Sequence, residues 1–292
     1  MFFFKKENET PKRFVAVLGT SPLAKFLTYI LQENNIDVVS LLNKEKNIKE
    51  ESCVFKNNIQ NQSFSFKTCN KLSRKPECCF LASSFDEYKN DLLMLSDGML
   101  KGVKVVNFAS FYNHEVVKQL AGINEVRAYF DSWLVKDKKD LILLSRTAEI
   151  TLCQKEDNED YKDIESLLFN KKVEIKLRKD SSKMFWQKVS SWFLGNLLVL
   201  AYNNSIANIL LDSNVRKKVD EIIKEIARIL ANKDIDIDTQ VLLTDIYAFP
   251  DDFLSEYSSP RGCLALIDMF AGVDRFECPN LFELIGATTK KY

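Results

Sequence analysis

The residues best suited to chemistry near the start of the chain form a short turn, GTSPL. The apolar, β-branched residues 14–18 before the turn favour a buried strand, and Pro22 suits the first turn of a helix. A strand that passes through a tight turn into a helix presents free N–H groups and the positive end of the helix dipole, which bind phosphate. The turn therefore indicates a nucleotide-binding site. Its residues are Gly19, Thr20, Ser21, Pro22 and Leu23.

The match of this turn to the dinucleotide-binding fingerprint is incomplete. The fingerprint has three glycines, whereas the chain has only Gly19, with Ser21 and Ala24 at the second and third positions. Ser21 or Thr20 could simply cap the helix. A βαβ unit with a purely structural turn is therefore the alternative interpretation.

Few residues support other kinds of catalysis. The single histidine, His114, excludes a histidine-based triad and a multi-histidine metal site, and its context is that of an exposed helix cap. No G-x-S-x-G, Walker A or C-x-x-C pattern occurs, so hydrolase, phosphate-transfer and structural zinc functions lack their motifs. We therefore expect no metal. The seven scattered cysteines indicate free thiols in a reducing cytoplasm.

The composition limits which cellular compartments and which binding partners are expected for the protein. Lys plus Arg and Asp plus Glu are equal at 41 each, so no overall field attracts nucleic acid or an anionic membrane. The opening MFFFKK is too short and wrongly charged for a signal peptide, and no apolar run approaches the length of a membrane span. We expect a cytoplasmic protein without nucleic-acid or membrane partners.

Apolar runs and amphipathic stretches alternate through the first 120 residues. The patterns predict strands at 36–42, 78–82 and 103–108, and helices at 22–31, 86–100 and 114–120. In the polar stretch 45–75, only VFKNN and SFSFK alternate enough to suggest short strands. Strands that alternate with helices are typical of a mostly parallel sheet covered on both faces.

From Glu125 the pattern changes. The runs EVRAYFDSWLV and DLILLSRTAEITLCQ flank the polar turn KDKKD, which predicts an antiparallel hairpin appended to the sheet. A short helix then ends near Phe169, and residues 173–178 close the sheet. Beyond Asp180 the sequence predicts helices, including 213–232 and 239–247. We therefore expect an α/β Rossmann-like domain at 1–180, an all-α domain at 181–292 and an active cleft between them.

The helical half carries a specific resemblance. FWQKVSSWFLGNLLVLAYNN resembles the signature of ketopantoate reductases, the NADPH-dependent 2-dehydropantoate 2-reductases, in which a W-x-K tripeptide opens the first helix of the C-terminal domain. SSPRGC resembles the family's Ser-Ser-Met segment, and CPNLFELI resembles its C-terminal P-x-N and final helix. The resemblance covers the whole chain in order of elements. It implies a helical domain like the C-terminal domain of 6-phosphogluconate dehydrogenase.

The resemblance implies roles for several residues. Lys188 matches the catalytic lysine, which protonates the developing alkoxide and holds the 2-keto acid; a solvated helix lysine is the alternative. Asn196, two helical turns further on, matches an asparagine that contacts substrate. Ser258 and Ser259 match the substrate-binding serine segment. The family asparagine between the two helix positions is Trp192 here.

The chain also differs from the family pattern at positions near the cofactor and at one acidic position. The family's Asn-Gly turn beside the nicotinamide becomes Phe108-Ala109, with Asn107 one position early. The family's acidic residue near the substrate falls on Leu266, two before Asp268, so that its role is either vacant or taken by Asp268. No acid follows the second strand, where Asn43 and Lys44 favour the 2′-phosphate of NADPH over NADH. A solvated run of charged residues is the alternative interpretation of Lys44 and Lys46. The cofactor contacts implied outside the first turn are Asn43, Lys44, Ser83, Asn107 and Phe108.

Together these features predict an NADPH-dependent oxidoreductase that reduces ketopantoate or a similar 2-keto acid in pantothenate and coenzyme A biosynthesis. The lost glycines and the substitutions at Phe108 and Leu266 leave a competing hypothesis open. In it, the chain is a catalytically degenerate paralogue that binds a nucleotide or a small acid without turnover. The aromatic residues of the helical half are consistent with a homodimer.

Overall fold

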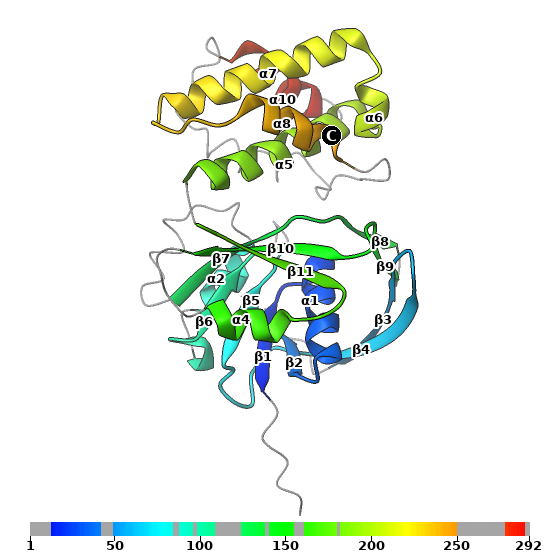
Figure 1. Cartoon of the computed structure of the whole chain (residues 1–292), viewed down its shortest axis with the longest axis vertical. Coiled ribbons are helices and arrows are strands. Elements are labelled where there is room, and N and C mark those ends of the chain that lie inside the picture. The colour runs from blue at the N-terminus through cyan, green and yellow to red at the C-terminus, as the bar shows by residue number, and fades with distance from the viewer. Residues whose placement is uncertain are drawn as a thin grey trace, which may run out of the picture. The chain divides into compact units, whose positions relative to one another are not determined.

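The structure is a computed structural model that describes residues 13–41, 49–83, 88–95, 98–108, 124–137, 140–154, 161–179, 182–249 and 278–289. The described residues form two compact units, one up to Arg178 and one from Lys179 onward. The first is a Rossmann-like α/β unit, and the second is built of helices (Figure 1). The fold class expected from the sequence is therefore confirmed.

The strands of the first unit form one sheet. The bounds are β1 Phe14–Leu18, β2 Asp37–Leu41, β3 Lys49–Lys56, β4 Asn61–Cys69, β5 Cys78–Leu81, β6 Lys104–Asn107, β7 Asn124–Phe130, β8 Leu134–Asp137, β9 Asp140–Leu143, β10 Ala148–Gln154 and β11 Val173–Lys179. Over the described residues, the order is β11-β10-β7-β6-β5-β1-β2-β4-β3-β9-β8. The central pairs from β4 through β2, β1, β5 and β6 to β7 are all parallel.

The direction in which the chain winds changes at β1. From β1 the chain moves to β2 on one side, and it later returns to pair β5 with the other side of β1. At the carboxyl end of the strands, Leu18 is in register with both Leu41 and Leu81. Such a topological switch point is where open α/β sheets bind ligands.

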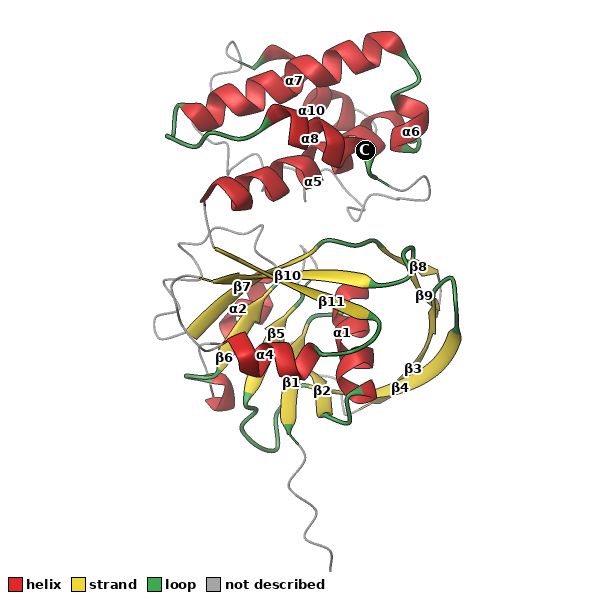
Figure 2. Ribbon diagram, viewed as in Figure 1, coloured by secondary structure: helices red, strands yellow, loops and turns green. Residues whose placement is uncertain are grey.

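Helix α1, Pro22–Glu33, lies inside the curve of this sheet. The sequence predicts one apolar stripe, but Ala24 and residues 26–31 are all buried. The difference arises because the sheet curls around the helix, as Figure 2 shows. Phe26 lies 5.9 Å from the ring of Phe55 on β3 and 5.6 Å from that of Phe130 on β7, two strands far apart in the sheet order. Strands β8 and β9 also contact α1.

The strands on either side of KDKKD belong to both ends of the curled sheet. The sequence predicts two long strands, but each is interrupted, so that β8 pairs with β9 next to the turn and β7 pairs with β10 further away. β7 also pairs with β6, whereas β9 pairs with β3. One bent hairpin therefore joins both ends of the strand order, which a local sequence pattern does not reveal.

The remaining elements of this unit follow the expected order, with some changes in length. β3 and β4 form an antiparallel hairpin longer than the two short strands predicted there. Helix α2, Tyr88–Leu95, and the 3-10 turn η1, Gly98–Leu100, occupy part of the predicted helix 86–100. Helix α4, Tyr161–Leu168, packs against α1. The helix predicted at 114–120 lies outside the described residues.

The second unit packs its helices around α5. The bounds are α5 Ser182–Tyr202, α6 Ile206–Ile209, α7 Ser213–Ala231, α8 Thr239–Tyr247 and α10 Pro279–Thr289. Helix α5 packs against α6, α8 and α10, and α7 against α8 and α10. A Cβ atom at Gly195 would lie 2.2 Å from the Phe249 ring, so this glycine allows close packing on α5. Over the described ranges, none of the helices is both long enough and apolar enough to cross a bilayer.

Candidate functional site

Gly19 occupies the turn that leaves β1 at the switch point. Its φ of +112° lies in a region that favours glycine, and an added Cβ would lie 2.6 Å from both the Ala82 oxygen and the Ser83 Cα atom. The backbone N–H of Ala82 donates to the Leu18 oxygen at 2.9 Å, which ties the ends of β1 and β5 together. Gly19 is therefore required by both conformation and space.

The first turn of α1 follows directly. Ser21 is the N-cap: its Oγ accepts from the Ala24 N–H at 3.0 Å and donates to the Ala82 oxygen at 2.5 Å. Pro22 has no N–H, which leaves the N–H of Leu23 as the donor at the second helical position. No acidic residue lies in this turn. The turn can therefore receive an anion, with fewer donors than a glycine-rich turn presents.

Ser83 follows β5 at the same edge of the sheet. Its Oγ donates to Asp91 Oδ2 at 2.5 Å, and Asp91 is buried on α2. In the sequence, Asp91 has no feature that distinguishes it from the other polar residues of the predicted helix. The contact shows that α2 fixes the Ser83 hydroxyl beside the Gly19 turn.

Asn107 and Phe108 end the neighbouring strand, β6. Asn107 is 2% exposed, and its Nδ2 donates to Glu125 Oε1 on β7 at 2.8 Å. Phe108 is buried, and its ring lies 6.4 Å from that of Phe80. Its N–H donates to the Leu81 oxygen at 2.9 Å. In this structure the Phe108 side chain packs in the core.

Two residues with roles implied by the family resemblance lie on α5. Lys188 is half-buried, and its backbone oxygen accepts from Ser191 Oγ at 3.0 Å. Asn196 is fully buried, and its Nδ2 donates to the Trp192 oxygen one turn earlier, at 2.8 Å. Both residues belong to the helical unit, whereas the Gly19 turn belongs to the α/β unit.

Several predicted positions lie outside the described residues. These are Asn43 and Lys44 after the second strand, the substrate segment Ser258 and Ser259, and His114, Leu266 and Asp268. In the described part of the chain, no three His, Cys, Asp or Glu side chains gather as metal ligands would.

The thiols of β5 lie next to the switch point but are buried in the sheet. Burial raises the pKa of the Cys78 thiol to about 12 and also raises that of Cys79. Because the thiolate is the reactive form, these two cysteines are inert packing residues rather than nucleophiles.

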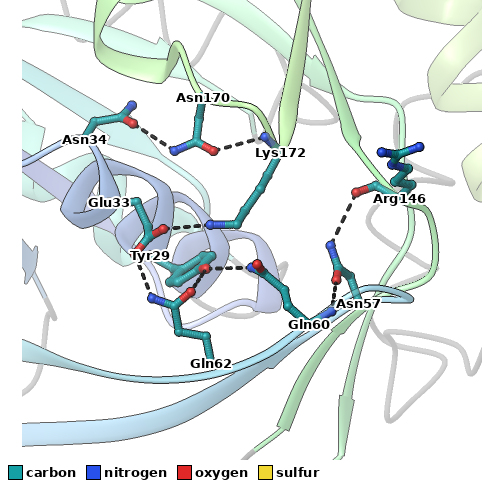
Figure 3. A network of polar contacts seen from close by, with 9 residues as sticks. All are labelled: Tyr29, Glu33, Asn34, Asn57, Gln60, Gln62, Arg146, Asn170 and Lys172. Atoms are coloured by element: carbon teal, nitrogen blue, oxygen red, sulfur yellow. Dashed lines mark hydrogen bonds and ion pairs between the residues drawn. The ribbon is translucent and has the colours of Figure 1, made fainter.

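The other end of α1 is held by a network of polar side chains (Figure 3). Tyr29 donates to Gln62 Oε1 at 2.8 Å and accepts from Gln60 Nε2 at 3.2 Å. Lys172 donates to Glu33 at 2.7 Å, and its ammonium lies 5.0 Å from the centre of the Tyr29 ring. The network ties α1 to the β3–β4 hairpin and to the turn before β11, so that the helix is fixed at the end opposite Gly19.

Charge and burial act in opposite directions within this network. The hydrogen bond from Lys172 lowers the pKa of Glu33, and burial raises the pKa of Tyr29. Burial alone would lower the pKa of Lys172, but its contacts with Glu33 and Tyr29 raise it overall. The Lys172 ammonium and the Glu33 carboxylate therefore each favour the charged form of the other.

No protein-family model and no curated protein sequence matches the chain. Solved structures do match it. D-mandelate dehydrogenase in ternary complex with NADH and anilino(oxo)acetate aligns over 95% of this chain and 99% of its own, with a TM-score of 0.76 and 14% identity. The dimeric ketopantoate reductase from Staphylococcus aureus aligns over the same shares, with a TM-score of 0.72 and 12% identity. The chain has the ketopantoate reductase fold.

A further structure supports the ketopantoate reductase fold. The ketopantoate reductase from Ralstonia eutropha aligns over 95% of this chain and 99% of its own, with a TM-score of 0.74 and 11% identity. The resemblance predicted from the motifs is thereby confirmed at the level of the fold. At these identities the likeness extends to the arrangement of elements, and the chemistry depends on the individual residues.

Proposed function

We propose that this chain is a nicotinamide-dependent oxidoreductase that reduces a small 2-keto acid to the 2-hydroxy acid. The observation that carries the proposal is the ketopantoate reductase fold, which aligns over 95% of this chain, with Gly19 at the switch point of its sheet. The structures with this fold include two reductase types, named for ketopantoate and for mandelate, which share 2-keto/2-hydroxy acid chemistry. The proposed substrate class, a small 2-keto acid, is common to these two types of enzyme.

The residues of the first turn fit a dinucleotide. The Leu23 N–H and the positive end of α1 would hold the pyrophosphate, and no carboxylate in the turn repels it. Gly19 would let the backbone approach the phosphates closely. When bound, the nicotinamide supplies the hydride. For the finer form of the proposal, NADPH is favoured by Asn43 and Lys44 in the sequence, where NADH would be favoured by an acid.

Lys188 would supply the proton. A hydride that reaches the carbonyl carbon leaves negative charge on the substrate oxygen, and an ammonium group within hydrogen-bond reach stabilises this charge and protonates it. Asn196, Ser258 and Ser259 would orient the acid, as the resemblance implies. The finer substrate is ketopantoate, which would place the enzyme in pantothenate and coenzyme A biosynthesis in the cytoplasm.

The test is oxidation of NADPH and NADH in the presence of ketopantoate or phenylglyoxylate, the keto acid that corresponds to mandelate. We expect Lys188→Ala to lower kcat by about 10²-fold, the scale for losing a positioned acid. Nucleotide affinity should change little, because the pyrophosphate would bind at the Gly19 turn. Lys183→Ala is the matched control, since Lys183 is exposed on the same helix.

An unchanged rate in folded Lys188→Ala would remove this lysine from the mechanism. Absence of turnover with both keto acids would instead favour the second candidate, a degenerate paralogue that binds nucleotide or a small acid. Two observations favour that candidate: Phe108 is packed in the core, and Asn196 Nδ2 bonds to its own helix. Titration with a dinucleotide would separate this degenerate paralogue, which binds a nucleotide, from a chain that binds neither cofactor.

The proposed assembly is a homodimer. The Staphylococcus aureus ketopantoate reductase is described as dimeric, which supports this choice. Light scattering of the purified chain at micromolar concentration would measure the mass directly. A monomer mass of 33.7 kDa under those conditions would contradict the dimer.

A further inference from the structure

In the side-chain amide of Asn107, the nitrogen makes a hydrogen bond and the oxygen does not. Its Nδ2 donates to Glu125 Oε1 at 2.8 Å, while its Oδ1 is buried and has no hydrogen-bond partner in the described part of the chain. Buried polar atoms are nearly always paired, and an unpaired one costs about 1–3 kcal/mol. The open oxygen therefore calls for a donor from outside the described residues.

Glu125 determines which half of the amide is open. An ionised carboxylate only accepts hydrogen bonds, so the NH₂ group of Asn107 must face it and the oxygen must lie on the other branch of the amide. The strand register supports this pairing. Glu125 lies opposite Val105, and Arg127 lies opposite Asn107, so Asn107 and Glu125 project from the same face of the sheet.

The position of Asn107 suggests which donor would fit. Asn107 ends β6, which is in register with β5, and β5 in turn pairs with β1 at the switch point. A nicotinamide ring carries a primary carboxamide, whose N–H is a donor of the required kind. A ligand bound across this edge of the sheet would bring such a group to the end of β6 if its pyrophosphate occupied the Gly19 turn.

We propose that Glu125 is a positioning residue, which holds the Asn107 amide so that Oδ1 accepts an N–H from the carboxamide of the bound nicotinamide. This inference rests on the proposed function only in requiring a nicotinamide cofactor. The family resemblance already implies a cofactor contact at Asn107, and the inference adds the accepting atom, Oδ1, and the indirect role of Glu125.

The experiment compares two cofactors by calorimetric titration, without turnover. One is whichever of NADP⁺ and NAD⁺ binds more tightly, and the other is its 3-acetylpyridine analogue, in which a methyl ketone replaces the carboxamide and removes the N–H. We expect the wild type to prefer the carboxamide form by about tenfold, the scale of one hydrogen bond to a buried acceptor. Asn107→Leu should reduce the preference to about twofold or less.

Variants at Glu125 test positioning. Glu125→Leu should lose most of the preference, because the amide can then turn its NH₂ toward the ligand. Glu125→Gln should regain part of it, because the glutamine oxygen can still accept from Nδ2. The matching ADP-ribose ligand, which lacks nicotinamide, is the control for folding and for the phosphate site. Its affinity should be the same in all variants.

The outcomes separate this inference from the proposed function. A wild type without preference would overturn the contact at Asn107, and a full preference in Glu125→Leu would overturn the positioning role. If neither dinucleotide binds to the wild type, both proposals fail. If the preference follows the expected order but no keto acid is reduced, the inference stands and the reductase proposal fails.

Discussion

Two helices of this chain begin with proline but complete their first turns differently. Helix α10 begins at Pro279, and the Glu225 carboxylate from α7 accepts from the N–H groups of Asn280 and Leu281 at 3.1 and 2.9 Å. Helix α1 begins at Pro22 and has only the neutral hydroxyl of Ser21 at the Ala24 N–H. The positive end of α10 contains a built-in anion, whereas the first turn of α1 contains no acidic residue of its own.

The difference separates a structural helix end from a candidate binding end. Glu225 is only 5% exposed and also accepts from Asn280 Nδ2 at 2.8 Å, so its charge is taken up inside the helical unit. At α1, the corresponding turn lies beside Gly19 and the switch point, and the turn itself contains no acidic residue. An anion from a ligand could therefore fill the role at α1 that Glu225 fills at α10.

The largest effect is expected from Gly19→Ala. The added Cβ would lie 2.6 Å from backbone atoms of Ala82 and Ser83, and alanine is strained at a φ of +112°. Strain and overpacking together should lower the free energy of unfolding by about 3–4 kcal/mol. Denaturant unfolding measures this loss, with Gly102→Ala as the control for positive φ without crowding. A loss no larger than that of the control would show that close approach is not important.

This glycine illustrates what the sequence could predict about the site. The strand, the cap and Pro22 followed from local patterns, because each depends on residues within a few positions. The contacts that complete the site span greater distances: Ser83 to Asp91, and Asn107 to Glu125 across two strands. Such pairs depend on tertiary packing, which the sequence pattern alone does not reveal.

The fold, too, was predictable only where it depends on residues close in sequence. The order of elements and the helix at Thr239–Tyr247 were predictable from apolar spacing and a following proline. The curled sheet was not, because the bends at residues 131–133 and 144–147 bring β9 to β3 only in three dimensions. Helix α1 is buried on all sides because the sheet curls around it, and not because of the composition of the helix.

At the N-terminus of α10, we expect Glu225→Gln to lower the free energy of unfolding by about 2 kcal/mol. The amide has one accepting oxygen, so one of the N–H groups of α10 faces an NH₂ group instead of an acceptor. Glu221→Gln is the matched control, because Glu221 is more exposed on the same helix and pairs with Lys224 within it. Equal stability of the two variants would contradict a built-in anion at α10.

At the N-terminus of α1, Ser21→Asp introduces an acidic residue at a helix end whose first turn has none. The aspartate is also a good N-cap, but its charge would repel the cofactor pyrophosphate, and we expect dinucleotide affinity to fall by about tenfold, or 1.4 kcal/mol. Ser21→Ala separates charge from the lost hydrogen bond to Ala82. Calorimetric titration of all three proteins gives the comparison, and equal weakening by Asp and Ala would exclude a charge effect.

The smallest effect concerns the carboxyl end of α1, where Glu33 is an acid at the negative end of the helix. No basic residue lies in the last turn, and Lys172 supplies the cation from outside the helix. Because this contact lowers the pKa of Glu33 below its ordinary 4.5, its stabilisation is complete above pH 4.5 and is lost as the pH falls through the lowered folded-state pKa. Glu33→Gln should therefore cost about 1 kcal/mol or less near pH 7 and nothing in strong acid. Urea unfolding at a series of pH values measures the difference, and a cost that persisted at low pH would mean that Glu33 acts through packing rather than charge.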